Sequence, residues 1–228
     1  MPTILAIDTS SDLASVALLH RDELITHATE GVQTHSQTIL PMVQLALKQA
    51  GIRLDECDAI AFGAGPGSFT GVRTACGVAQ GLAFGAGLPL VPVGTLEAMA
   101  QACRSDCGAA EVLTLLDARM EEVYWAQYRY DGGWREVAAP ALAKPAAVAP
   151  SGVPVACGNG LLAYAPVFDA MSFADRRADI APHAGAIATL AQERFAAGQT
   201  ITAREAQPVY LRNKVALTTA ERLARAGG

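Results

Sequence analysis

The chain has 228 residues, of which 51% are hydrophobic and 17% are charged. This composition supplies enough apolar side chains for one large domain or two small ones and is unlike that of a disordered protein. The net charge is -5 and no Lys/Arg cluster is present, which argues against a chain that grips a nucleic-acid backbone by itself.

The cysteines are odd in number and show no C-x-x-C spacing, whereas structural zinc uses four ligands in recognisable pairs. We therefore expect reduced, mostly buried thiols in a cytosolic protein. The five are Cys57, Cys76, Cys103, Cys107 and Cys157.

The N-terminus reaches its first charge at Asp8 without a basic leader, so it reads as a strand rather than a signal peptide. The most apolar stretch, 75–93, is interrupted by four glycines, Gln80 and two prolines. We therefore expect no membrane span and a cytoplasmic protein.

Apolar runs and turn residues predict the elements of the first hundred residues in chain order. Two of the early runs are joined by the turn 20–22, which is typical of an antiparallel meander. Helices and strands then alternate, and Gly51 lies where a helix C-cap is expected. The predicted strands are 3–7, 15–19, 24–29, 59–63 and 88–93, and the predicted helices are 36–50, 70–85 and 95–103.

The pattern restarts near residues 105–110. A strand again ends in an acidic residue, Asp117, and a turn and a long alternating strand follow, so we predict a duplicated α/β unit. The fold class is α/β, with two lobes and mixed sheets flanked by helices. The first lobe is expected over 1–105 and the second over 106–228, with the final segment from about 206 returning to the first.

Further elements are predicted for this second half. Its strands are 112–116, 122–130 and 153–157, its helix is 183–197, residues 138–154 form a surface connection, and the tail is extended over 208–211 and then polar and frayed.

The segment 63–71 is the sharpest local feature, because five of its nine residues are glycine or proline. It lies between a predicted strand and a predicted helix. There, backbone N–H groups could receive an anion, or a tight turn could let helix and strand pack closely. It is not a Walker A loop, since no lysine follows Gly71, and Thr70 breaks the dinucleotide fingerprint. Ser68 does not fit a hydrolase nucleophile elbow and is expected to be a turn residue.

The helices predicted over 36–50 and 70–85 carry surplus apolar surface. In the first, apolar positions span an arc of about 160°, wider than the stripe of about 100° that suffices for one sheet. In the second, glycine recurs every fourth residue and forms a flat ridge that permits close helix approach. Two explanations stay open: the surface is buried against another chain, or the two helices cover each other in a deep core.

Five stretches along the chain resemble those of one protein family. They are ILAIDTS at 4–10, HSQTILP at 35–41, GPGSFTGVR at 65–73, DARM at 117–120 with VYW at 123–125, and PVYLRN at 208–213. The run at 65–73 is highly specific, and together the stretches span essentially the whole chain. On these residues the chain is similar to the TsaB family, also called YeaZ.

The resemblance implies a two-lobed fold of the actin and sugar-kinase ATPase class in a cytosolic bacterial protein. It also implies a non-catalytic subunit that pairs with a TsaD-like catalytic paralogue and recruits a TsaE-like ATPase. The complex adds threonylcarbamoyl to N6 of the adenosine beside the anticodon in tRNAs that read A-starting codons. The chain would form a homodimer in isolation and contact tRNA only through the complex.

The family contact uses the first two helices, which are the helices with surplus apolar surface. The residues expected at this partner interface are His35, Ile39, Leu40, Val43, Leu47, Val72, Arg73, Cys76, Gly77 and Gln80.

The ATPase class holds phosphates with two hairpins, each an acidic residue followed by small residues. Residues 8–10 fit the first hairpin, but residues 118–120 of the second carry side chains where glycine should let the backbone close on phosphate. The adenosine-binding glycine loop is represented at best by 158–160. The residues expected to face this vestigial site are Asp8, Thr9, Ser10, Gly65, Gly67, Asp117 and Arg119.

The isolated chain is therefore expected to bind no cofactor, with ATP or ADP and metal on its partner subunits. In the TsaD-like paralogue a His-x-x-x-His pair on the third helix binds the metal, and the matching positions here are Thr95 and Met99. Neither can replace imidazole, so we expect no metal site and no catalytic residue. Two alternatives stay open: an ATP-dependent kinase or carbamoyl-type transferase of the same fold, and a glycoprotease-like metallopeptidase.

Overall fold

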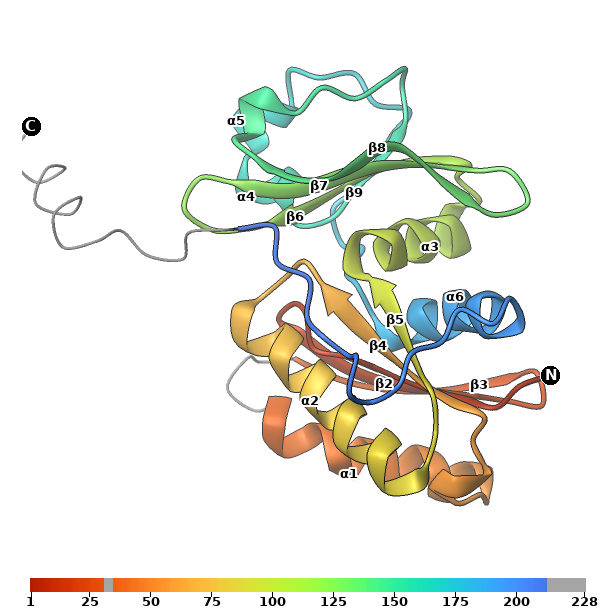
Figure 1. Ribbon diagram of the computed structural model, residues 1–228. Coiled ribbons are helices and arrows are strands. Elements are labelled where there is room, and N and C mark those ends of the chain that lie inside the picture. The colour runs from red at the N-terminus through yellow and green to blue at the C-terminus, as the bar shows by residue number, and fades with distance from the viewer. Residues whose placement is uncertain (31–34, 213–228) are drawn as a thin grey trace, which may run out of the picture.

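The computed structural model describes residues 1–30 and 35–212, which form two lobes, each built on a five-stranded sheet (Figure 1). Every element predicted for the first hundred residues is confirmed, with ends that shift by a few residues. The elements of this part are β1 (Ile4–Asp8), β2 (Leu13–His20), β3 (Glu23–Glu30), α1 (His35–Ala50), the short helix η2 (Leu54–Glu56), β4 (Ala59–Gly65), α2 (Phe69–Ala86), β5 (Leu90–Gly94) and α3 (Thr95–Cys107).

The second half holds more short elements than its sequence predicts. They are β6 (Glu111–Asp117), β7 (Val123–Tyr130), β8 (Trp134–Ala143), η3 (Pro145–Ala147), β9 (Val155–Cys157), α4 (Gly160–Ala163), α5 (Ala165–Phe168), β10 (Asp175–Arg177) and α6 (Ala184–Ala196).

The first sheet has the strand order β3-β2-β1-β4-β5. Strand β2 is antiparallel to both of its neighbours, β1 and β3, whereas β4 and β5 run parallel to β1. Leu5 and Ile7 of β1 pack against α1 and α2, whereas Ile4 and Ala6 pack against α6. Figure 1 shows α1 and α2 together on one face and α6 on the other. Because both faces are covered, β1 is apolar at every position before its terminal Asp8.

The second sheet has the order β10-β9-β6-β7-β8. Its face toward the first lobe is covered by α3, whose Leu96 and Met99 join the core between the lobes. Its outer face is covered by α4 and α5, with the wholly buried Phe168 at the centre of a separate cluster.

The two sheets repeat one topology, so the predicted duplication is confirmed. In each, the first strand of the unit pairs antiparallel with the second and parallel with the fourth. Placing β1 on β6 maps the order 3-2-1-4-5 onto 8-7-6-9-10. This is the two-lobed architecture, with mixed sheets flanked by helices, that is typical of the actin and sugar-kinase fold.

The predicted surface connection over 138–154 is wrong in its first part, because residues up to Ala143 belong to β8. This strand lies at the edge of the sheet, where a proline costs no ladder hydrogen bond. Its pairing with β7 skips register between Trp125 and Gln127, opposite the segment that contains Pro140. A run rich in alanine and proline therefore forms a bulged edge strand.

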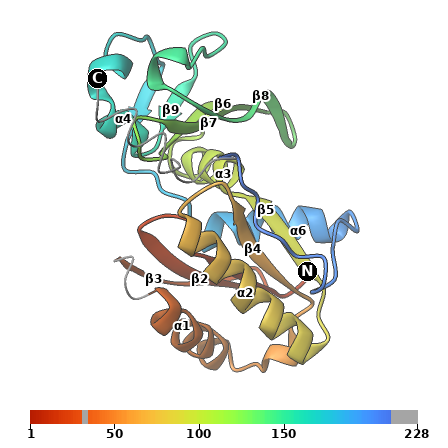
Figure 2. The ribbon, with the colours of Figure 1, turned by 60° about the vertical axis from the view of Figure 1, so that its left-hand side comes forward.

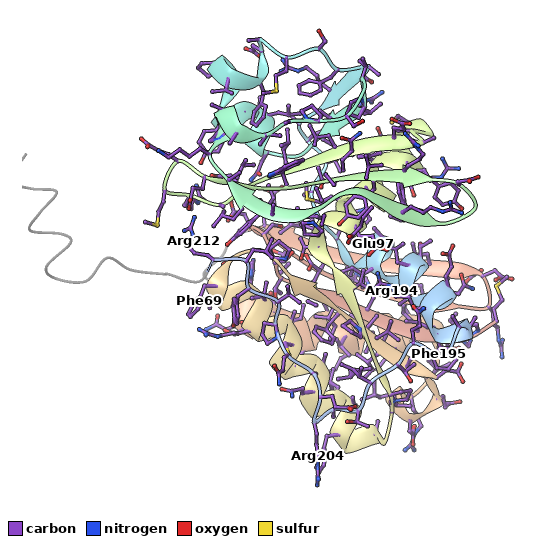
Figure 3. All side chains as sticks on the ribbon, turned by 45° about the horizontal axis from the view of Figure 1, so that its top comes forward. Phe69, Glu97, Arg194, Phe195, Arg204 and Arg212 are labelled. Atoms are coloured by element: carbon purple, nitrogen blue, oxygen red, sulfur yellow. The ribbon has the colours of Figure 1, made fainter. Side chains whose placement is uncertain are left out.

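After the second sheet, the chain returns to the first lobe at α6, earlier than residue 206. On α6, Arg194 forms an ion pair with Glu97 of α3 and donates a hydrogen bond to the carbonyl of Pro92; Figure 3 shows the two charged side chains at the junction of the lobes. Figure 2 shows the segment after α6 running back along the first lobe toward the second lobe.

Backbone hydrogen bonds fix that returning segment. Ile201 exchanges a pair with Leu90, and the Val209 N–H donates to the carbonyl of Ala64 at 2.7 Å. We call residues 207–212 the strap. The polar tail predicted beyond it lies outside the described residues. Within the parts of the chain that the structure describes, no helix is both long and apolar enough to cross a membrane.

Candidate functional site

A cavity of about 350 Å³ opens between the lobes. Both predicted hairpins, the glycine loop and the strap contribute to its wall. Figure 3 marks Phe69 and Arg212 at this junction. The lining residues are Ser10, Ser11, Asp12, Gly67, Ser68, Phe69, Leu116, Asp117, Ala118, Arg119, Met120, Tyr124, Asn159, Val209, Tyr210 and Arg212.

The first hairpin follows β1 and turns its acidic residue away from this cavity. Asp8 is wholly buried, and its Oδ2 accepts hydrogen bonds from the N–H (3.4 Å) and Oγ (3.1 Å) of Ser10. Its Oδ1 has no partner among the described residues. Burial raises the pKa of Asp8 from 3.8 to about 6, against the lowering effect of the hydrogen bonds. Of the three residues expected to face nucleotide here, Ser10 lines the cavity, whereas Asp8 and Thr9 do not.

The glycine loop packs directly on this hairpin. A Cβ at Gly67 would lie 2.3 Å from the carbonyl oxygen of Ser10, and one at Gly71 would lie 1.8 Å from that of Thr9. The Thr9 hydroxyl also donates to the carbonyl of Gly71 at 2.7 Å. Glycine is required at both positions because backbone fills the space of a side chain. The loop is thus the close-packed turn that was one of the two explanations of its composition.

The remaining loop positions fit this role. Ser68 is the N-cap of α2, and its Oγ accepts a hydrogen bond from the N–H of Gly71 at 3.4 Å, as its expected turn role requires. Gly65 has φ 108° and faces the carbonyl of Val209 in the strap. Gly65 therefore packs against the strap and does not line the cavity, whereas Gly67 does.

The second hairpin follows β6 and keeps its acidic residue at the cavity. Asp117 Oδ1 accepts hydrogen bonds from the N–H of Arg119 and from the hydroxyl of Tyr164, at 2.9 and 2.8 Å. Burial, followed by the hydrogen bond to Asp117, raises the pKa of Tyr164 to about 12. Asn159 accepts from the Asp117 N–H at 2.8 Å. These neighbours hold Asp117 as a fixed acceptor on the cavity wall.

Three consecutive residues of the second hairpin have left-handed backbone: Arg119, Met120 and Glu121, with φ of 60°, 55° and 59°. Such a run is costly for residues with a Cβ. The Arg119 guanidinium lies 3.2 Å from Asp117 and 3.9 Å from Asp12 across the cleft. Arg119 and Met120, two of the three residues expected to crowd a phosphate at 118–120, line the cavity.

The strap holds this turn from the other side. Arg212 pairs with Glu122 at 2.6 Å, contacts the Met120 sulfur at 3.2 Å and lies 3.4 Å from the carbonyl of Arg119. Sequence reasoning missed Arg212 and Tyr164 as parts of the site, whereas Asn159, which lines the cavity, lies in the adenosine-binding glycine loop named at 158–160. Arg212 lies in one of the five family stretches, which was the one signal that could have found it.

The residues predicted at a partner interface separate into three groups. Four of them, Ile39, Val43, Val72 and Cys76, are buried in the core of the first lobe. They point toward the sheet, so they are not available on the surface of this chain. A long apolar run cannot by itself tell the inner face of a helix from the outer.

His35, Leu47 and Gln80 are also engaged within the chain. His35 is buried with its ring nitrogen 3.3 Å from the carbonyl of Asp12, and Leu47 is half-buried against the core. The Gln80 amide donates to the carbonyls of Ala203 and Ala206, which fixes the returning segment.

The outer face of α1 and α2 is formed by other residues together with the rest of the predicted set. Leu40 and Leu45 are 45% and 50% exposed, and Phe84 is 75% exposed. Arg73 is exposed, with its guanidinium 3.4 Å from the ring centre of Phe69. Ideal Cβ atoms at Gly77, Gly81 and Gly85 meet no atom within 4 Å among residues 1–30 and 35–212. We call the residues Leu40, Leu45, Arg73, Gly77, Gly81, Phe84 and Gly85 the outer helix face.

The two positions that match metal ligands of the catalytic paralogue are both wholly buried. Met99 packs in the core between the lobes, and the hydroxyl of Thr95 has no partner within the described residues. Across residues 1–30 and 35–212, no three His, Cys, Asp or Glu side chains are grouped so that they could hold a metal ion.

Known proteins resemble this chain over nearly its whole length. A family model described as "TsaD: tRNA N6-adenosine threonylcarbamoyltransferase" matches residues 22–228. The "tRNA threonylcarbamoyladenosine biosynthesis protein TsaB" of Escherichia coli K12 is 42% identical over 221 residues, 93% of this chain and 96% of that protein. The protein of the same name from Haemophilus influenzae Rd is 43% identical over 230 residues, 93% of this chain and 94% of that protein.

A solved structure supports the same relationship. "YeaZ from Pseudomonas aeruginosa" is 40% identical, with a TM-score of 0.88 over 92% of this chain and 100% of that chain. On sequence, topology and coverage together, this chain belongs to the TsaB (YeaZ) family.

Proposed function

We propose that the chain is a non-catalytic subunit of the bacterial complex that adds threonylcarbamoyl to N6 of the adenosine beside the tRNA anticodon. In this role it pairs with a TsaD-like catalytic subunit and recruits a TsaE-like ATPase. Membership of the TsaB family supports the pathway, because its relatives carry the name of tRNA threonylcarbamoyladenosine biosynthesis. The net charge of -5 favours contact with tRNA only through the complex.

The observation that carries the pairing is the outer helix face. A helix glycine is destabilising by roughly 1 kcal/mol relative to alanine, yet none of the residues that the structure describes occupies the space above Gly77, Gly81 or Gly85. Their packing within the chain therefore gives no reason for the ridge. A flat ridge beside the exposed Phe84 of the same helix suits the close approach of another helix.

In isolation, two copies of the chain pair through the same face and form a homodimer. The catalytic subunit, as a paralogue, then competes with the second copy for one surface. ATP or ADP and metal belong in this scheme to the partner subunits. The side chains of Arg119 and Met120 in the cavity support that assignment.

The pairing is tested by mixing the full chain with its TsaD-like subunit and sizing the mixture at micromolar concentration. We expect Gly77→Arg to weaken pairing by at least about 100-fold, since a buried interface centre tolerates little added volume. In the chain alone this substitution meets open space, so the thermal unfolding midpoint should not fall. Leu45→Glu should act in the same direction.

Leu162→Glu is the matched control, because Leu162 is 71% exposed on the second lobe. It should leave pairing unchanged. Separate species for the unmodified proteins, or pairing that survives Gly77→Arg and Leu45→Glu, would refute the outer helix face as the interface.

An ATP-dependent enzyme of the same fold is the second candidate, favoured by the cavity that both hairpins line. Calorimetry with ATP and magnesium on the isolated chain separates the two. The subunit role predicts no low-micromolar binding, and a clear signal would favour the enzyme.

A further inference from the structure

Three of the five cysteines gather where α3 meets the second sheet. Cys103 and Cys107 lie one turn apart on α3, with their sulfur atoms 3.9 Å apart. Cys157 of β9 lies with its thiol 3.9 Å from the carbonyl of Met99 on the same helix. Cys103 and Cys157 are wholly buried, whereas Cys107 is partly exposed. The two other thiols, Cys57 and Cys76, lie in the core of the first lobe.

The three sulfurs are electrostatically unequal. Hydrogen bonds from the thiols of Cys157 and Cys107, together with the positive charge of Arg177, lower the pKa of Cys103. Burial raises the pKa of Cys107 and of Cys157. Arg177 is held beside the cluster by Asp106 at 3.1 Å. Cys103 is therefore the thiol of the cluster that is most readily ionised, and a thiolate is the nucleophile in disulfide chemistry.

We propose that Cys103 and Cys107 form a reversible disulfide when a hydroperoxide reaches this end of α3. The accessible Cys107 releases its proton to water and its thiolate attacks the peroxide. An S–O bond forms, the O–O bond breaks, and the leaving oxygen takes up a proton and departs as alcohol or water. Cys107 is now a sulfenic acid, and the peroxide has been reduced by two electrons. The Cys103 thiolate, whose proton has passed to water, then attacks that sulfur. The S–S bond forms, the S–O bond breaks, and the departing hydroxide takes up a proton and leaves as water.

The end of a helix gives this pair the freedom to close. A disulfide requires an S–S distance of about 2.05 Å, so the two sulfurs must approach each other. Cys107 is the last residue of α3, and Gly108 follows with φ 74°. The last turn of α3 can therefore open while the rest of the helix stays intact. Cys157 lacks this freedom, because β9 is paired on both sides, with β6 and β10.

The test uses the full chain, hydrogen peroxide and alkylation of the remaining thiols, read by intact mass and peptide mapping. We expect the number of alkylated thiols to fall from the five of the reduced chain by two, with a disulfide mapped to Cys103 and Cys107. A thiol reductant should restore all of them. Cys57 and Cys76 should stay alkylated under denaturing conditions throughout.

Three variants make the test specific. Cys107→Ser should lose no thiol pair, and Cys103→Ala should hold a sulfenic acid at Cys107 that a carbon nucleophile such as dimedone traps. Cys157→Ala is the matched control and should close as the unmodified chain does. Five intact thiols after peroxide, a bridge that involves Cys157 or a second chain, or loss of a thiol pair in Cys107→Ser would each overturn the proposal.

Discussion

The loops that follow β1 and β6 hold equivalent places in the two sheets but are built differently. After β1, Asp8 is wholly buried and the glycine loop closes over the backbone of Thr9 and Ser10. After β6, Asp117 stays at the cavity and Arg119 begins three left-handed residues. The duplicated unit has kept its strand order and changed its turns. The conformation of the first turn depends on the glycine loop that packs against it. That of the second turn depends on its own side chains and on the strap.

The largest effect is expected from adding a side chain where the glycine loop closely approaches the backbone of the first turn. Gly71→Ala places a Cβ 1.8 Å from the carbonyl oxygen of Thr9, a backbone atom that cannot yield without moving the hairpin. We expect a loss of at least about 3 kcal/mol in the free energy of unfolding, at the high end for overpacking. Urea unfolding of the purified chain measures it.

Gly77→Ala is the matched control, because Gly77 lies in the same helix and its added Cβ meets no described residue within 4 Å. There the better helix propensity of alanine should raise stability by roughly 1 kcal/mol. Equal effects of the two substitutions would contradict the assignment of Gly71 to close packing.

The buried carboxyl of the first turn should make stability depend on pH. Because burial raises the pKa of Asp8 from 3.8 to about 6, the folded chain holds a proton that the unfolded chain releases between these values. Stability therefore falls as the pH rises through this window, by about 3 kcal/mol from this group at 1.36 kcal/mol per pKa unit. Unfolding midpoints in urea at pH 4 to 7 test the sign.

Asp8→Asn should remove this part of the slope, whereas Asp12→Asn, at an exposed position of the same loop, should keep it. A slope that is the same in all three proteins would show that Asp8 does not retain its proton in the folded state.

The contrast between the turns also marks how far the sequence could predict the molecule. Strands and helices of the first lobe follow from period and turn residues, because both sheet faces are covered and apolar runs are long. The edge strand β8 was missed because an edge accepts Pro140 and alanine, which lack a strand signal. The short α4, α5 and β10 carry too few residues for any period to show.

Residues of the site could be predicted from the sequence only where their own segment of the chain decides their position. Ser10, Gly67, Asp117 and Arg119, which the family resemblance led us to expect at a vestigial nucleotide site, line the cavity. Burial of Asp8 was not predictable, because it depends on Gly63 of the neighbouring strand, where a Cβ would lie 2.0 Å from the Asp8 Oδ1. For Ile39 and Val43, no local signal distinguishes a core from a partner, since both environments are apolar.

The next largest loss of stability is expected from removing the contact between the strap and the second turn. Arg212 is 15% exposed and joins the strap to Glu122 and to the turn backbone. Arg212→Ala should lower the free energy of unfolding by about 2 kcal/mol, the loss of hydrogen bonds to a charged group. Arg129→Ala removes a more exposed pair with Glu111 and should cost under about 1 kcal/mol. Similar losses would mean that the strap does not support the turn.

The smallest effect tests the strain of the second turn itself. Met120 has φ 55°, where glycine is free of the Cβ penalty of about 1 kcal/mol or more. Met120→Ala removes the side chain from the cavity and keeps the strained backbone, so the difference between Met120→Gly and Met120→Ala isolates the strain. We expect the glycine variant to be more stable by about 1 kcal/mol in urea unfolding. If alanine is as stable as glycine here, the left-handed turn is not strained, and the crowding of the second hairpin comes from its side chains alone.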